Sequence, residues 1–406
     1  MAVAAASRAR DVRVMSVVGV CHFFSHFYQL ALPPLFVLIH ETQGYSYESL
    51  ALLITVFFAT SFSCQIPVGF FVDRYGARPI LMAAVALMAG TTCLYGLVPG
   101  YPALVALSVV AGAANSVFHP ADYSILNASV SKQRLGKAFG VHNFGGFIGY
   151  AAAPIVMAAL GKTWGWQNAV IILGIVGLIV VAVATALSGD FRDSSHARRE
   201  TEIQSNLRAD LRLLFNAPAL LCALFFALLA GGQMGPQFFG DKVYYLAHEI
   251  PVLIGNSFIT VFVIAISVGI LSGGIVADRV RNHIPLAVGS FAASGAAIFL
   301  MGIVPPAPQI IYVVFAAAGF LFGFGFSSRD LVVSKLAPPE ASGKVFGFVF
   351  SGLDIGAALV PIAYGYLLGA GLPLLVFYLA ALLVAAAGIS VYAAGKSVDR
   401  PAPKAA

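Results

Sequence analysis

Six ionisable residues in otherwise apolar stretches could carry a proton or bind a charged molecule. They are His22, His26, His119, Asp122, Arg329 and Asp354. Histidine changes charge near neutral pH, so a buried histidine can hold a proton. A carboxylate in a membrane helix can do the same, and a guanidinium group can bind an anion. We therefore interpret these six residues as candidates for binding protons and a small substrate.

The same residue types also have a structural interpretation, because a polar side chain in a membrane helix can simply hydrogen-bond to a neighbouring helix. We favour that interpretation for His142, and we favour function for His22 and His119. Counting from the ends of the apolar stretches places His26 and Asp354 among the deepest residues. Asp354 is the only deep carboxylate, which makes it the best carboxylate candidate for a coupling proton.

The elements that must position these residues are membrane helices. Of the 406 residues, 60% are hydrophobic and only 10% are charged, whereas soluble domains carry roughly 25% charged residues. A helix needs roughly 20 apolar residues to cross the bilayer core. The sequence therefore predicts an all-α membrane protein with twelve transmembrane helices. Their apolar runs lie at about 14–39, 48–72, 79–98, 102–127, 137–160, 167–188, 217–240, 251–277, 284–303, 308–333, 343–368 and 372–395.

A long polar segment separates the first six runs from the last six. We predict an N-terminal six-helix bundle over 1–188, a cytoplasmic linker over 189–216 and a C-terminal six-helix bundle over 217–406. The basic residues before the first run resemble the start of a signal peptide. However, the run is longer than the roughly 7–15 apolar residues of such a peptide, so we interpret it as the first spanning helix.

Lysine and arginine are distributed unevenly over the two sets of loops. With both termini inside, 20 of the 23 Lys and Arg residues fall on the cytoplasmic side. Lys162 and Lys242 fall on the other side, and Arg329 lies within a predicted helix. Because basic residues concentrate in cytoplasmic loops, we expect a multi-pass protein of the inner (plasma) membrane with both termini cytoplasmic.

The two halves contain a repeat. Residues 136–154 (GKAFGVHNFGGFIGYAAAP) and 343–361 (GKVFGFVFSGLDIGAALVP) are identical at nine of nineteen positions, at an offset of 207 residues. At this offset Asp122 corresponds to Arg329, so opposite charges occupy equivalent positions. Such a pair could close a cytoplasmic gate, or each charge could find a partner within its own half. Both interpretations stay open.

A loop motif follows the second run. Gly69-Phe-Phe-Val-Asp73-Arg74-Tyr-Gly76-Ala-Arg78 resembles the signature G-x-x-x-D-R/K-x-G-x-R/K of the major facilitator superfamily, and a degraded copy follows the eighth run. The resemblance implies two pseudo-symmetric bundles with the substrate near the midplane between them. It also implies a gating role for Asp73, Arg74, Gly76, Arg78, Asp278 and Arg279. For Arg78, simple anchoring by positive charge explains the pattern equally well.

A narrower resemblance covers roughly the first 160 residues. Ser116-Val-Phe-His119-Pro120, the later Gly145-Gly146-x-x-Gly149, and His22 and Gln29 before a proline pair are similar to the fosmidomycin-resistance group of drug exporters. This resemblance implies export and histidines of functional importance at 22 and 119.

No G-x-x-x-x-G-K-[ST] nucleotide motif occurs, so we expect an ion gradient, with protons favoured, to supply the energy. We predict a secondary active transporter and not an enzyme, namely a proton-coupled exporter (an antiporter) of a small polar or anionic compound working by alternating access. The alternative is a proton-coupled uptake porter for an organic anion such as a carboxylate.

We expect no cofactor and no metal site, since the four cysteines stand apart. The expected partners are a small-molecule substrate, protons and the lipid bilayer, with no nucleic acid, and the protein is expected to be a monomer.

Overall fold

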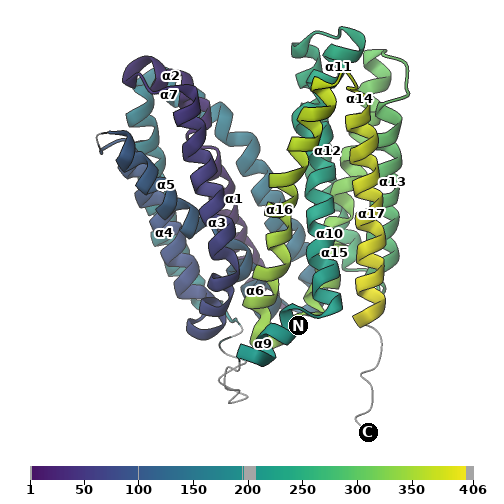
Figure 1. Ribbon diagram of the computed structural model, residues 1–406. Coiled ribbons are helices and arrows are strands. Elements are labelled where there is room, and N and C mark those ends of the chain that lie inside the picture. Colours follow the sequence, from purple (N-terminus) through teal and green to yellow (C-terminus); the bar gives the residue numbers. More distant parts are fainter. Residues whose placement is uncertain (1, 99, 194, 196–206, 399–406) are drawn as a thin grey trace. The chain divides into compact units, whose positions relative to one another are not determined.

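The computed structural model describes residues 2–98, 100–193, 195 and 207–398. This described part of the chain is helical and contains no strand, which confirms the predicted all-α class. The chain divides into two compact units (Figure 1). Unit 1 comprises Met1–Gln204 with Pro338–Gly347, and unit 2 comprises Ser205–Ala337 with Phe348–Ala406.

Unit 1 is a bundle in which α1 and α4 pack against α7, and α3 packs against α5. Short 3-10 turns at Pro33–Leu35 and Lys132–Arg134 connect its helices, and a third, Ser188–Asp190, follows the last of them. The helices are α1 (Ala2–Gln29), α2 (Phe36–Gln43), α3 (Tyr47–Tyr75), α4 (Ala77–Tyr95), α5 (Tyr101–Asn115), α6 (Phe118–Ser129) and α7 (Leu135–Leu187).

Unit 2 is a second bundle, in which α12 packs against α14 and α17 packs against both α10 and α13. A five-residue π-helical turn, Gly235–Phe239, joins α10 to α11. The helices are α9 (Leu207–Leu214), α10 (Ala217–Met234), α11 (Gly240–His248), α12 (Val252–Ala277), α13 (His283–Met301), α14 (Pro308–Phe324), α15 (Phe326–Ser334), α16 (Ser342–Gly369) and α17 (Leu375–Val398). The first turn of α16, with the 3-10 turn Pro339–Ala341 before it, belongs to unit 1.

Helix α7 accounts for two of the predicted membrane crossings. Among the described residues, 11 helical segments are long and apolar enough to span a membrane, and one of them, Lys132–Asp190, has 59 residues. A helix rises 1.5 Å per residue, so the 53 residues of α7 would extend about 80 Å, far beyond a hydrocarbon core of about 30 Å. The helix is interrupted at Gly165, where φ is +81°. Counting its two parts separately gives the twelve predicted spans.

Prolines explain two breaks within predicted runs. The first run, 14–39, is divided between α1 and α2 around Pro33 and Pro34, and the fourth run is divided between α5 and α6 just before Pro120. Proline has no backbone N–H and clashes with the preceding helical turn, which favours a break at these two places, although α3, α7 and α16 continue through Pro67, Pro154 and Pro361. The second break places His119 and Asp122 in a separate short helix, α6.

Corresponding glycines give both units the same close helix contact. A Cβ atom on Gly145 or Gly149 of α7 would lie 2.6 or 2.3 Å from a backbone oxygen of α1. A Cβ atom on Gly352 or Gly356 of α16 would lie 2.1 Å from a backbone oxygen of α10. These two glycine pairs are related by the 207-residue offset of the sequence repeat. Small residues let membrane helices approach closely, so the repeat is present in the packing as well as in the sequence.

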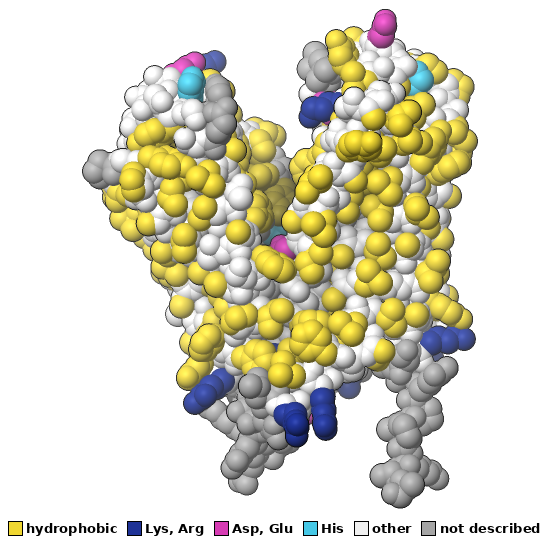
Figure 2. All heavy atoms as spheres, viewed as in Figure 1, with side chains coloured by type: hydrophobic (Ala, Val, Ile, Leu, Met, Phe, Trp, Pro, Cys, Tyr) yellow, Lys and Arg dark blue, Asp and Glu magenta, His cyan; other side chains and the backbone are white. Residues whose placement is uncertain are grey.

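The surface matches a membrane environment. On the face shown in Figure 2, apolar side chains cover the long sides of the helices in both units, while Lys and Arg side chains gather mostly at one end of each bundle. Large apolar residues such as Ile155, Val313 and Tyr366 are each more than two-thirds exposed. A soluble protein rarely exposes such continuous apolar surface.

Candidate functional site

Helices α1, α6 and α7 bring five ionisable residues of unit 1 together. Helix α1 contributes His22 and His26, α6 contributes His119 and Asp122, and α7 contributes His142. The two histidines of α1 share a helix face because they are four residues apart. Four of the five were candidate site residues in the sequence, and His142 joins them in the structure.

Asp122 links two of these histidines. Its Oδ2 atom lies 3.1 Å from Nδ1 of His22 and 3.1 Å from Nε2 of His142. Asp122 is 0% exposed, and the two histidines are each 1% exposed. An ionised carboxylate only accepts hydrogen bonds, so both ring nitrogens then donate to it. These two bonds tie α1, α6 and α7 together through a single carboxylate.

The imidazole rings form a compact group. The rings of His22 and His142 are stacked, with centroids 3.6 Å apart. The centroid of His22 is 4.5 Å from that of His26 and 5.2 Å from that of His119. His26 and His119 are partly exposed, in contrast to the buried pair. The group can hold protons or a cation, and His26 and His119 are its more accessible members.

Gly146 of α7 provides the space for the two histidines of α1. A Cβ atom at this position would lie 2.9 Å from Cε1 of His26 and 3.0 Å from Nε2 of His22. The first distance is shorter than real side chains show and the second is unusually tight, so a side chain here would displace the rings. The glycine-rich sequence of α7 therefore positions the histidines, in addition to allowing α1 and α7 to approach.

A hydrogen-bonded chain of uncharged side chains lies next to the histidines. Tyr150, whose ring centroid is 4.2 Å from that of His26, donates to the side-chain oxygen of Gln29. Gln29 donates to Asn115 over 3.1 Å, and Asn115 donates to Ser61 over 2.9 Å. These bonds join four helices of unit 1. The sequence singled out only Gln29 among these four residues.

Arg329 occupies the position in unit 2 that corresponds to Asp122 in unit 1. It is 3% exposed, and its Nε donates to Oδ1 of the neighbouring Asp330 over 3.1 Å. Its guanidinium carbon lies 4.8 Å from the ring centroid of Phe226 and 3.8 Å from that of Phe326. Asp122 and Arg329 thus each have partners within their own unit, as one of the two sequence interpretations expected. A gating role for this pair stays a prediction.

Asp354 lies on α16, in the part of this helix that belongs to unit 2. Its side chain is only partly exposed, and its Oδ2 atom is buried without a hydrogen-bond partner among the described residues. An ionised carboxylate in such a position is costly in a membrane. The position therefore suits a carboxyl group that gains and loses a proton.

The signature loop is held by hydrogen bonds at both of its ends. Asp73 is fully buried and accepts bonds from the backbone N–H groups of Gly343 and Lys344 at the start of α16. Gly76 has a φ of +98°, which favours glycine. Arg78 donates to the side chain of Ser188 over 2.8 Å. These contacts give Asp73, Gly76 and Arg78 defined structural positions.

The remaining basic residues of the two loop copies differ from Asp73 in their surroundings. Arg74 is exposed, with its guanidinium carbon 5.4 Å from the ring centroid of Tyr75. In the second copy, Asp278 is half-buried just after α12, and Arg279 is exposed. The gating roles of the loop residues stay predictions.

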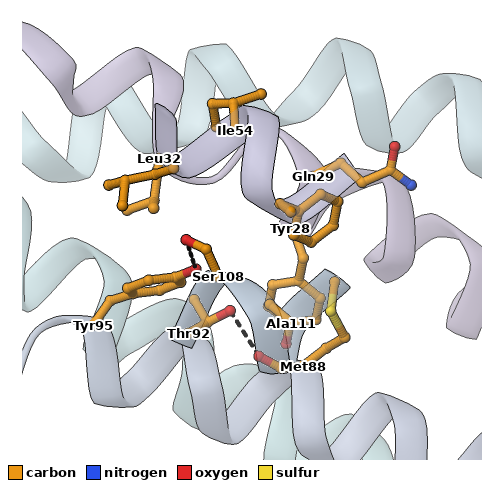
Figure 3. Close-up of a pocket in the computed structure, with 11 residues that line it drawn as sticks. Tyr28, Gln29, Leu32, Ile54, Met88, Thr92, Tyr95, Ser108 and Ala111 are labelled. Atoms are coloured by element: carbon orange, nitrogen blue, oxygen red, sulfur yellow. Dashed lines mark hydrogen bonds between the residues drawn. The ribbon is translucent and has the colours of Figure 1, made fainter. Parts of the chain in front are cut away.

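A small pocket lies beside the polar chain, between α1, α3, α4 and α5 (Figure 3). Tyr28, Leu32 and Met88 line it, and its polar wall is formed by Tyr95 and Ser108, whose hydroxyl groups are 2.9 Å apart. Its cavity volume is about 20 Å³, room for about one water molecule. It is too small to hold a substrate.

These bundles, with their buried ionisable side chains and apolar outer surfaces, define a polytopic membrane protein. Residues 18–255 and 243–406 match the Major Facilitator Superfamily. The chain therefore belongs to this family, whose members are membrane transporters and not enzymes, and it is a secondary transporter. The sequence-based assignment to the superfamily and to a twelve-helix fold is confirmed.

Known relatives of the chain include proteins for both drugs and sugar acids. It is 22% identical over 368 residues to the fosmidomycin resistance protein of Escherichia coli (strain K12), covering 88% of each chain. It is 26% identical over 375 residues to the D-galactonate transporter of Escherichia coli O6:H1, covering 84% of each. The structure of the Escherichia coli fucose:proton symporter matches 97% of this chain and 100% of that one, with a TM-score of 0.74 and 12% identity.

Proposed function

We propose that this chain is a proton-coupled exporter of a small polar or anionic compound in the inner membrane, with both termini in the cytoplasm. The similarity to the fosmidomycin resistance protein supports export. The distribution of Lys and Arg over the loops supports the orientation. The observation that carries the proton coupling is the environment of Asp354.

Asp354 serves as the coupling carboxylate in this proposal. Its buried Oδ2 has no hydrogen-bond partner among the described residues, so no such bond stabilises the ionised form at that atom. A charged carboxylate within a membrane helix costs a few kcal/mol. Taking up a proton removes that cost, and losing it again requires a conformation in which water or the substrate reaches the group. Protonation is thereby coupled to conformation.

The cluster of unit 1 supplies the polar surface for the substrate and a further place for protons. His22, His26, His119 and Asp122 offer donors and acceptors inside an apolar bundle, and the two partly exposed histidines are accessible. The signature loop acts as the gate: Asp73 holds the first turn of α16, and release of that turn accompanies the conformational change.

Uptake of an organic anion is the second candidate function. The 26% identity to the D-galactonate transporter favours it, as does the buried cation of Arg329, because a guanidinium group binds carboxylates in a bidentate manner. In this case the same residues would serve transport in the opposite direction.

Two probes separate these functions in intact cells. Export predicts that expression lowers the accumulation of fosmidomycin, and uptake predicts that expression raises the accumulation of D-galactonate. A protonophore is added in parallel. Proton coupling predicts that collapsing the gradient abolishes the effect of expression, and an effect that survives the protonophore would contradict it.

The variant Asp354→Asn tests the role of that residue in proteoliposomes. We expect it to abolish uphill transport while exchange between the two sides continues, because the neutral amide binds substrate but carries no proton. Asp190→Asn is the matched control, since Asp190 pairs with Arg13 at the surface. Uphill transport at the wild-type rate by Asp354→Asn would show that another group carries the proton.

A further inference from the structure

Three histidines of unit 1 meet in a way that proton binding alone does not require. His22, His119 and His142 each offer a ring nitrogen, and these three nitrogens all lie within 4.8 Å of one another. The residues come from three different helices, α1, α6 and α7. Three imidazoles whose nitrogens converge form a typical ligand set for a transition-metal ion.

Asp122 occupies the position of the outer partner in such a site. Histidines that bind a metal usually donate their second ring N–H to a carboxylate, which fixes the ring and leaves the other nitrogen as an acceptor. The Oδ2 of Asp122 is 3.1 Å from one nitrogen of His22 and 3.1 Å from one nitrogen of His142. A single carboxylate thereby orients two of the three candidate ligands.

The dimensions of the group are close to those of a bound ion. Zinc–nitrogen distances of about 2.0–2.1 Å place tetrahedral ligands about 3.4 Å apart. The nitrogens here lie within 4.8 Å of one another, so binding an ion requires them to move closer and the stacked rings of His22 and His142 to turn apart. His119 is partly exposed while the other two histidines are buried, so His119 is the most accessible of the three to an entering ion.

We propose that His22, His119 and His142, oriented by Asp122, form a binding site for one divalent transition-metal ion. Neutral imidazole ligands select ions such as Zn²⁺, Co²⁺ and Ni²⁺ over Mg²⁺ and Ca²⁺, which prefer oxygen. The proposal does not depend on the transport direction, on Asp354 or on the identity of the transported compound.

The test measures metal binding by the full chain in detergent, purified without a polyhistidine tag, stripped with a chelator and then incubated with excess Zn²⁺. We expect one equivalent of Zn²⁺ to be retained per chain after gel filtration. We also expect added Co²⁺ to produce the visible absorption of a tetrahedral complex, and Mg²⁺ in large excess not to displace it. Neither readout involves transport, so a failure of this proposal is distinct from a failure of the proposed function.

Matched variants assign the ion to these residues. His22→Gln combined with His119→Gln is expected to abolish both signals, and Asp122→Asn to weaken binding by about 10–100-fold as an outer partner. His248→Ala, at the end of α11 in unit 2, removes a histidine outside the group and should change neither signal. Thermal unfolding of each variant checks its fold, and His119→Gln alone, at the partly exposed position, serves if the double variant does not fold. Absence of Zn²⁺ from the wild-type chain, or its retention by the folded histidine variant, overturns the proposal.

Discussion

Asp73 and Gly343 are joined by a hydrogen bond of 2.7 Å although 270 residues separate them in the sequence. The backbone N–H of Gly343 donates to Oδ1 of Asp73, and the N–H of Lys344 donates to Oδ2 over 3.0 Å. The first N–H groups of a helix have no partner within it, and a negative charge is favourable there. The aspartate of the signature loop therefore acts as the cap of α16.

Removing this cap is expected to destabilise the first turn of α16. Asp73→Ala leaves two buried N–H groups without their acceptor and should lower the free energy of unfolding by about 1–3 kcal/mol. Asp73→Asn retains one oxygen acceptor and should cost less. Thermal unfolding in detergent measures both effects. Asp190→Ala removes an exposed carboxylate paired with Arg13 and should cost less than about 1 kcal/mol; an equal loss in the two alanine variants would contradict the capping role.

A methyl group at Gly146 is expected to disturb the histidines without removing any of them. Gly146→Ala places a Cβ atom within 3.0 Å of both His22 and His26, and overpacking of this kind costs about 1–3 kcal/mol. Gly90→Ala on α4 is the control, because a Cβ atom there meets nothing within 4 Å. The chemical shifts of the histidine ring protons report the displacement, and unchanged shifts in Gly146→Ala would show that the rings are not held against this glycine.

Much of the fold could be predicted from the sequence because membrane helices are long and apolar. The two parts of α7 illustrate both the success and its limit. The sequence predicts the runs 137–160 and 167–188 as two spans, and the structure confirms a break between them at Gly165. Only one short polar stretch marks this break in the sequence, because the turn itself depends on the backbone conformation of Gly165. Periodicity indicates that a segment is helical, but it does not indicate how the chain enters and leaves the helix.

The candidate site could be predicted residue by residue but not as an arrangement. His22, His119 and Asp122 stood out because ionisable groups are rare in apolar helices. Their contact with His142 could not be predicted, since it depends on which faces of α1, α6 and α7 meet. The 207-residue offset suggested Asp122 and Arg329 as a pair, and the structure shows that each residue has a partner in its own unit.

The ion pair of Arg329 and Asp330 is expected to be strongly coupled. Both side chains are buried, with 3% and 0% exposure. Breaking a buried pair by removing one partner costs about 3–5 kcal/mol, because the other charge is left without compensation. Arg329→Gln should therefore reduce thermal stability sharply, and the double variant Arg329→Gln with Asp330→Asn should recover part of the loss. If the two single losses simply add in the double variant, the pair is not coupled.

The turn at Gly165 is expected to depend on backbone conformation alone. Its φ of +81° and ψ of +161° lie in a region that is accessible essentially to glycine only. A Cβ atom there would meet nothing closer than Oε1 of Gln167 at 3.9 Å, so Gly165→Ala creates no clash. The strain should nevertheless cost about 1–3 kcal/mol.

The control is Gly289→Ala in α13, where the added atom also meets open space. This variant should instead stabilise the protein by up to about 1 kcal/mol, since alanine favours a helix. Thermal unfolding of the two variants should therefore shift in opposite directions. A shift of Gly165→Ala to higher temperature would mean that the fifth and sixth spans are joined by a backbone that other residues can adopt.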